Sequence, residues 1–167
     1  QSGMLRVYEK IERPLIEVIG RMEMAGIEVN RQTLQEMSNQ FAQDLAKLES
    51  EIHDLAGTQF NIASPKQVGE VLFNQMGLQG GKKTKVGDWS TNVSILEELA
   101  PANPIVQKIL DHRGLSKLKS TYTDALQEQI EARTGRVHTS FSLAGTSTGR
   151  LASSDPNLQN IPIRTEE

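Results

Sequence analysis

Apolar residues recur at helical spacing along most of this 167-residue chain, in blocks that end at glycines. The first block covers residues 5–25, and Pro14 inside it predicts a kink. The second block covers residues 30–56, and its first residue, an asparagine, can cap a helix. Gly26 and Gly57 follow the two blocks as C-terminal stops, and we expect the two helices to pair antiparallel. Most of this chain is therefore predicted to be helical.

Three further helical segments follow. The run Ser64-Pro65-Lys66-Gln67 has the spacing of a helix cap with proline at the first helical position, and predicts a helix to about residue 76. Short and long helices are expected over 92–99 and 103–131, with a bend or a close approach of another segment at Gly114. Residues 78–91 are glycine-rich, basic and without periodicity, and we interpret them as a mobile tip.

After Thr134-Gly135 the pattern changes to alternation, with Val137, Thr139, Phe141 and Leu143 on one face. Alternation of this kind is typical of a β-strand. Residues 144–167 are rich in Gly, Ser, Thr, Asn and Pro, and favour turns and irregular strand arranged around a ligand. The predicted fold class is mainly α (α+β), with a helical part followed by a few short strands.

Composition excludes several classes of protein. No run of about 18 apolar residues could span a bilayer, so no membrane partner is expected. The absence of cysteine rules out disulfides and thiolate metal sites, and fits a reducing cytoplasm. Residues 1–3, Gln-Ser-Gly ahead of Met4, are interpreted as a remnant of a cleaved expression tag and carry no part of the fold argument.

Charge is distributed unevenly along the chain. Residues 1–76 hold 7 Lys and Arg against 11 Asp and Glu, whereas residues 77–165 hold 11 against 8. A basic second half is typical of a protein with one surface that faces phosphates. The alternative is chance unevenness in a helical protein.

Two basic clusters lie in the second half. Arg113 and Lys117, with Lys108 nearby, fall broadly on one side of the predicted long helix, where they can follow a phosphate backbone. The second cluster is at the tip and consists of Lys82, Lys83 and Lys85. The alternatives are a solvated helix face for the first cluster and a contribution to solubility for the second.

Catalytic motifs are not evident. The run Gly145-Thr146-Ser147-Thr148-Gly149-Arg150 lacks the spacing and the lysine of a nucleotide P-loop, although small residues beside one arginine can approach a DNA groove closely. The three histidines lie on different predicted elements, and the carboxylates of the second half are scattered. We therefore predict no catalytic residue and no metal site in this chain.

One run carries a family resemblance. Residues 148–164, Thr-Gly-Arg-Leu-Ala-Ser-Ser-Asp-Pro-Asn-Leu-Gln-Asn-Ile-Pro-Ile-Arg, closely resemble the segment that opens the palm of family A DNA polymerases. Residues 113–122 resemble the long thumb helix of that family, and residues 134–139 resemble the strand that follows it. The runs 60–67, 82–84 and 90–91 look like the rest of the thumb, so that the resemblance covers nearly the whole chain from Val7 onward.

The resemblance implies a thumb over residues 4–134, with its tip at about 78–91, and the beginning of a truncated palm over 135–167. Arg150 is then expected to reach the minor groove at the primer terminus. The resemblance places four further groups near DNA: Asn157, Gln159 and Asn160 near the primer end, Thr146 and Thr148 beside them, Lys117 and Arg113 on backbone phosphates, and the tip lysines over the duplex. Arg164 is expected near the nucleotide phosphates or the primer end.

The function implied is that of a fragment of a DNA-directed DNA polymerase, a nucleotidyltransferase of replication or repair in a bacterial cytoplasm, associated with the nucleoid. Its partner is primer–template duplex DNA. The resemblance places the metal-binding aspartates beyond Glu167, so the chain alone is expected to be inactive and without a cofactor, whereas the full-length enzyme takes Mg²⁺ and dNTP. The alternative is a helical protein–protein interaction module that does not bind DNA. We expect residues 144–167 either to lack fixed structure or to pair their strand edges with a neighbouring molecule.

Overall fold

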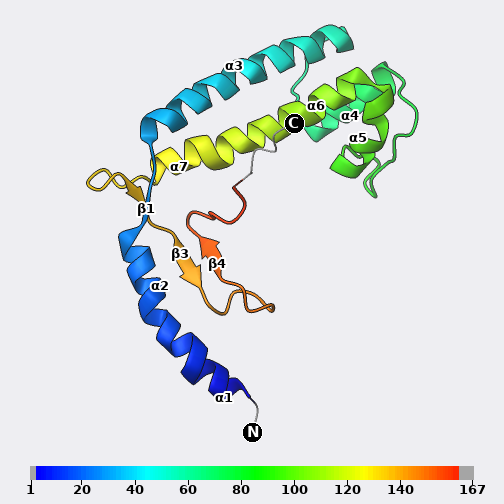
Figure 1. Cartoon of the computed structure of the whole chain (residues 1–167). Helices are drawn as coiled ribbons and strands as arrows, with labels where there is room; N and C mark the ends of the chain where they lie inside the picture. The colour runs from blue at the N-terminus through cyan, green and yellow to red at the C-terminus, as the bar shows by residue number, and fades with distance from the viewer. Residues whose placement is uncertain (1–2, 162–167) are drawn as a thin grey trace. The chain divides into compact units, whose positions relative to one another are not determined.

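The structure, a computed structural model, describes residues 3–161, and helices make up most of them (Figure 1). The helices are α1 (Met4–Val7), η1 (Tyr8–Glu12), α2 (Arg13–Ala25), α3 (Arg31–Ala56), α4 (Pro65–Gly69), η2 (Glu70–Gln75), α5 (Val93–Leu99), η3 (Ala100–Ala102), α6 (Pro104–Leu118), η4 (Lys119–Asp124) and α7 (Ala125–Glu128). The strands are β1 (Ile27–Glu28), β2 (Arg136–Val137), β3 (Ser140–Ser142) and β4 (Ala152–Ser154). The predicted mainly α fold with a few short strands is confirmed.

The chain divides into two compact units. Residues 3–35 and 122–161 form the first unit, and Glu36–Thr121 forms the second. The first unit is therefore assembled from two segments that are distant in sequence, whereas the second is continuous. No helix within residues 3–161 is long and apolar enough to cross a membrane.

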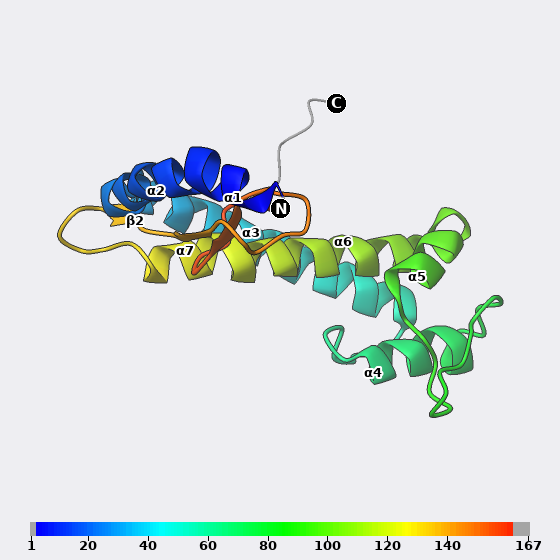
Figure 2. The ribbon, with the colours of Figure 1, turned by 90° about the horizontal axis from the view of Figure 1, so that it is seen from below.

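The second unit is organised around an antiparallel pair of helices, α3 and α6, which run side by side in Figures 1 and 2. Ile52 of α3 and Ile109 of α6 are fully buried, and both belong to the core of this unit. At the edge of the pair, Lys108 Nζ lies 2.6 Å from Glu51 Oε2. The other buried members of the core come from α4 to α6 and the preceding loop: Ile62, Val68, Leu72, Phe73, Leu96, Ala100, Ile105 and Val106.

Helix ends in the structure follow the predicted capping residues. The Thr33 amide donates to Asn30 Oδ1 at 3.1 Å, and the Gln67 amide donates to Ser64 Oγ at 3.4 Å. Gly57 ends α3 with φ at +68°, a conformation that favours glycine. The two side chains accept hydrogen bonds from free amides at helix N-termini, and the glycine ends a helix. The predictions made from these three residues are confirmed.

In the first unit, α1, η1 and α2 form one continuous helical stretch over residues 4–25. The wide π turn η1 ends two residues before Pro14, whose ring and missing N–H would disturb a regular helix at that point. Helix α2 contacts β3 through Glu23. The Glu23 carbonyl accepts a hydrogen bond from His138 Nδ1 at 2.7 Å, and Glu23 Oε1 accepts one from the Phe141 amide at 2.6 Å.

The expected antiparallel pairing of residues 5–25 with 30–56 is wrong. Helix α2 belongs to the first unit and most of α3 to the second. Ile27 and Glu28, which lie between the two helices, pair antiparallel with Val137 and Arg136. The expected close approach at Gly114 is also wrong, since a Cβ added there would meet nothing within 4 Å.

The second sheet joins β3 to β4, with Phe141 opposite Ser153. The predicted alternation is confirmed on this part of the chain, because Thr139 is buried and Ser140 and Ser142 are exposed. For the described part of 144–167, however, the expectation that it lacks fixed structure unless it pairs with a neighbouring molecule is wrong. β4 pairs within its own chain, and Thr139 Oγ1 lies 2.6 Å from Ser153 Oγ beneath the ladder.

Candidate nucleic-acid interface

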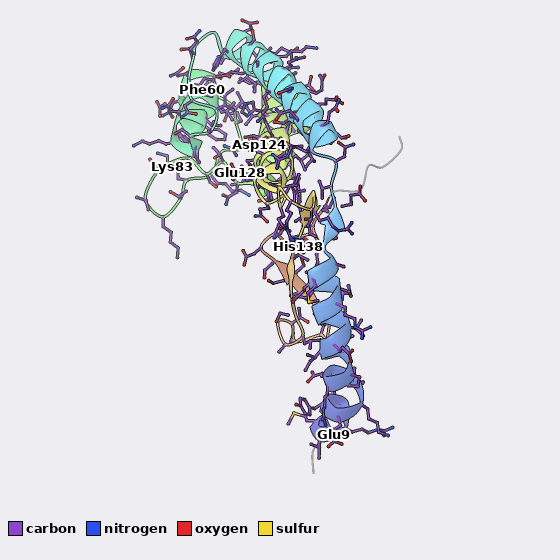
Figure 3. The ribbon with its side chains drawn as sticks, turned by 90° about the vertical axis from the view of Figure 1, so that its left-hand side faces the viewer. Glu9, Phe60, Lys83, Asp124, Glu128 and His138 are labelled. Atoms are coloured by element: carbon purple, nitrogen blue, oxygen red, sulfur yellow. The ribbon has the colours of Figure 1, made fainter. Side chains whose placement is uncertain are left out.

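The tip, residues 78–91, is a folded loop between η2 and α5. The Ser90 amide donates to the Lys82 carbonyl and the Thr84 amide to the Asp88 carbonyl, each at 2.8 Å. Lys82, Lys83 and Lys85 are all exposed on this loop, and Figure 3 labels Lys83 there. The non-helical tip is confirmed, and its mobility stays a prediction.

Two of the three tip lysines have neighbours inside the unit. Lys82 Nζ lies 3.8 Å from Glu98 Oε2, and both side chains are largely exposed. Lys83 Nζ lies 5.1 Å from the centroid of the Trp89 ring, within the range of a cation–π contact. Such exposed contacts are weak, so the ammonium groups can still exchange them for phosphates.

The basic residues of α6 differ in their contacts: two have partners within the unit and one is exposed to solvent. Arg113 is half-buried, and its Nη1 and Nη2 donate to the carbonyl and Oγ1 of Thr91, at 2.7 and 3.2 Å. Burial lowers the pKa of the Arg113 guanidinium. Lys108 is engaged with Glu51, whereas Lys117 is exposed beside Arg113 along an open groove of about 620 Å³. On this face, Lys117 is the cation best placed for an external phosphate.

In the first unit, residues 146–150 form a tight turn. Thr146 Oγ1 donates to the Arg150 carbonyl at 2.8 Å, and Thr148 Oγ1 lies 3.4 Å from Thr146 Oγ1. Gly149 has φ at +75°, which the turn requires. Thr146 is half-buried while Thr148 and the Arg150 guanidinium stand exposed, so the two hydroxyls shape the turn that carries the arginine.

Residues 151–160 are braced by their own amide side chains. Gln159 Nε2 donates to the Leu151 carbonyl, and Gln159 Oε1 accepts from the Ser153 amide at 3.2 Å. Asn157 Oδ1 accepts from the Gln159 amide at 2.9 Å, and the Asn160 carbonyl accepts from the Tyr122 hydroxyl. These contacts give the loop a fixed form next to β4. Arg164 lies outside the described residues.

The predicted site residues therefore lie in both units. The tip lysines, Arg113 and Lys117 belong to the second unit, and the series from Thr146 to Asn160 belongs to the first. Sequence reasoning missed Trp89, the only tryptophan in the chain, and Thr91, the partner of Arg113. A lone tryptophan next to three lysines is a signal that could have been used. Thr91 was noted only within the run 90–91 that resembles the thumb, and nothing local marks it as a partner of Arg113.

Comparisons with known proteins identify the family. The family model described as DNA polymerase family A matches residues 31–167. The chain is 58% identical over 167 residues to DNA polymerase I of Rhizobium leguminosarum, covering 99% of this chain and 16% of that protein. It is 49% identical over 166 residues to the thermostable DNA polymerase I of Thermus aquaticus, covering 99% of this chain and 20% of that protein.

A solved structure is also similar: the POL domain of Pol1 from M. smegmatis in complex with DNA primer-template and dNTP. The TM-score is 0.82 at 38% sequence identity, over 94% of this chain and 28% of that one. The chain thus spans a fifth or less of the length of these two curated relatives. Because the family model matches most of its residues, this chain belongs to DNA polymerase family A.

Proposed function

We propose that this chain is the part of a DNA-directed DNA polymerase that grips the primer–template duplex. The observation that carries this proposal is the likeness, over 94% of the chain, to a polymerase domain described in complex with primer–template DNA. In this proposal residues 4–134 are the thumb and residues 135–167 begin the palm. The grip serves replication or repair synthesis by the complete enzyme.

The phosphate backbone is the part of the duplex that the tip and α6 would hold. Lys82, Lys83 and Lys85 are exposed on one loop, and Lys117 is exposed on α6. Lysines bind phosphates as point charges without reading sequence, and each contact releases counterions. Binding by this set is therefore weak, independent of sequence and steeply dependent on salt. Arg113 contributes indirectly, because its hydrogen bond to the Thr91 carbonyl holds the end of the tip against α6.

Arg150 would read the minor groove. Purine N3 and pyrimidine O2 are acceptors in every Watson–Crick pair, so one guanidinium can contact all correct pairs at the primer end. The turn around Gly149 leaves this side chain exposed, and the Thr146 hydroxyl fixes the turn. Asn157, Gln159 and Asn160 lie on the braced loop that follows, where their exposed faces would approach the same end of the duplex.

Nucleotidyl transfer belongs to the complete enzyme, for which we propose dNTP as substrate and Mg²⁺ as the ion that supplies charge stabilisation. Within residues 3–161, no three His, Asp or Glu side chains gather where they could hold a metal ion. The described donor set does not fit the ion. We propose that this chain by itself binds DNA without extending a primer.

The test is fluorescence anisotropy of a labelled primer–template duplex, titrated with the chain at several salt concentrations. Arg150→Ala and Lys117→Ala should each weaken binding, and Lys117→Ala should also lower the slope of log K against log salt by about 0.9, one phosphate contact. Lys47→Ala is the matched control, because it removes one exposed charge from α3 at a position with no proposed DNA contact. Equal losses in all three variants would show only a net-charge effect and would refute the assigned contacts.

The competing function is a helical protein–protein interaction module. One observation favours it: the stretch from α1 to α2 exposes large apolar side chains, among them Leu5 at 65%, Ile16 at 55% and Met24 at 79%. An apolar surface of this kind commonly marks a contact with protein. Failure of the unaltered chain to bind the duplex even at low salt would favour this function over the DNA grip.

A further inference from the structure

Trp89 stands at the closing end of the tip, directly before the residues that lead into α5. It is the only tryptophan of the chain, and none of the phosphate contacts proposed above involves it. We propose that Trp89 is a positioning residue that holds the basic loop, residues 82–85, in the form that meets the duplex backbone. This inference rests on the proposed DNA grip and adds to it the residue that organises the tip.

The indole is fixed to η2 from one side. Its Nε1 donates to Asn74 Oδ1 at 2.9 Å, and Asn74 Nδ2 in turn donates to Glu70 Oε2 at 2.7 Å. The Trp89 ring also packs on buried Phe73, with centroids 4.9 Å apart and planes inclined by 37°. A stacked ring with a satisfied N–H has few alternative positions.

Two glycines allow the loop to lie this close to α4 and η2. A Cβ added to Gly69 would lie 2.7 Å from Trp89 Cβ, and a Cβ added to Gly81 would lie 2.6 Å from Phe73 Cδ1. Gly81 directly precedes the basic loop. The glycines therefore allow close packing at both Trp89 and Phe73, the two residues whose rings are in contact.

The basic loop is joined to Trp89 by both backbone and side chain. Lys83 and Trp89 form an antiparallel bridge, flanked by the hydrogen bond from the Ser90 amide to the Lys82 carbonyl. The Lys83 ammonium lies 5.1 Å from the indole centroid. Through these links the position of the indole sets the position of the lysines.

The expected gain is preorganisation. A glycine-rich loop with free lysines would lose its conformational freedom on binding a phosphate backbone, and that loss subtracts from affinity. A loop already held against η2 loses less. The lysine over the ring can move to a phosphate without any rearrangement of the backbone, because the cation–π contact is exposed and weak.

The experiment compares the whole chain with Trp89→Ala and Trp89→Phe, using the same labelled duplex and salt series. In Trp89→Ala, we expect the dissociation constant to rise about tenfold at low salt and the salt slope to fall by about 1 to 2, as phosphate contacts are lost from a loop whose lysines are unchanged. Trp89→Phe keeps the ring against Phe73 and should recover most of the binding.

A readout without DNA separates this inference from the proposed function. Amide hydrogen exchange at Thr84 and Ser90 should become faster in Trp89→Ala while exchange in α6 stays slow. Unchanged exchange at these two amides, or weaker binding with an unchanged salt slope, would overturn the positioning role and leave the DNA grip standing. No duplex binding by the unaltered chain would overturn the proposed function and this inference with it.

Discussion

Replacing Arg113 with methionine separates two roles for this residue, a phosphate contact and an internal brace. The structure gives its guanidinium two hydrogen bonds to Thr91, and Thr91 is itself buried. Methionine has an unbranched side chain that can pack along the same path and cannot donate a hydrogen bond. In Arg113→Met the Thr91 carbonyl therefore loses its charged donor in a place that water reaches poorly.

The magnitude follows from those two bonds. Hydrogen bonds to charged groups contribute about 1.5 to 3 kcal/mol each. The guanidinium is only half-buried and the second bond, at 3.2 Å, is the longer one, so the two do not add in full. We expect Arg113→Met to lower the free energy of unfolding of the second unit by about 2 to 3 kcal/mol. Thr91→Val, which removes only the hydroxyl acceptor, should cost about 1 kcal/mol.

Urea unfolding followed by tryptophan fluorescence is the assay. The single tryptophan, Trp89, lies in the same unit as Arg113 and Thr91, so its signal reports the part of the chain that is perturbed. The double variant completes a thermodynamic cycle, and a coupling energy above about 0.5 kcal/mol is expected for residues in contact.

The brace would be refuted by an Arg113→Met variant that unfolds at the same urea concentration as the unaltered chain. If that variant also bound the primer–template duplex with a lower salt slope, Arg113 would be a phosphate contact, as the family resemblance implies. If Arg113→Met lost the full amount of about 2 to 3 kcal/mol of stability and its salt slope for duplex binding did not change, Arg113 would be an internal brace only.

Three further predictions concern stability. Burial lowers the pKa of His112, so its contribution to stability is full above the ordinary histidine pKa of about 6.5 and is lost as the pH falls below that value. The urea midpoints at pH 7.5 and 5.5 should therefore differ less in His112→Gln than in the unaltered chain. Gly26→Ala should lower the free energy of unfolding, measured by heating, by at least about 2 kcal/mol, because φ is +64° and the new Cβ would lie 2.7 Å from the His138 ring. The control Gly20→Ala, in open space on α2, should be neutral or stabilising. Ile109→Ala should cost about 2 to 5 kcal/mol in the same measurement, since the side chain is fully buried, and a loss below 1 kcal/mol would contradict the core assignment.

Helix ends were predictable from the sequence because their chemistry is local. Asn30 and Ser64 accept hydrogen bonds from amides three residues ahead, and Gly57 supplies a positive φ, so each signal and its effect lie within one turn. The alternation around Val137 was predictable for the same reason. A side chain that acts within four residues of itself can be interpreted without knowing the fold.

Pairings over long sequence distances were not predictable in this way. Nothing near Ile27 indicates that its partner is Val137. Likewise, nothing in residues 5–56 indicates that α2 and most of α3 belong to different units. Arg113 and Lys117 look equivalent on a helical face, yet only Arg113 meets a carbonyl supplied by Thr91. Which of two similar cations remains exposed depends on the segment that packs beside it.

The two-segment construction of the first unit has a consequence for synthesis on the ribosome. Residues 36–121 are contiguous and can fold as soon as they emerge, while residues 3–35 must wait for 122–161, and β1 waits for Val137. Residues 3–35 therefore lack their partner segment while residues 36–121 are being made. Arg150 follows the tip lysines in the chain, so it becomes part of a folded unit only after those lysines are already in place.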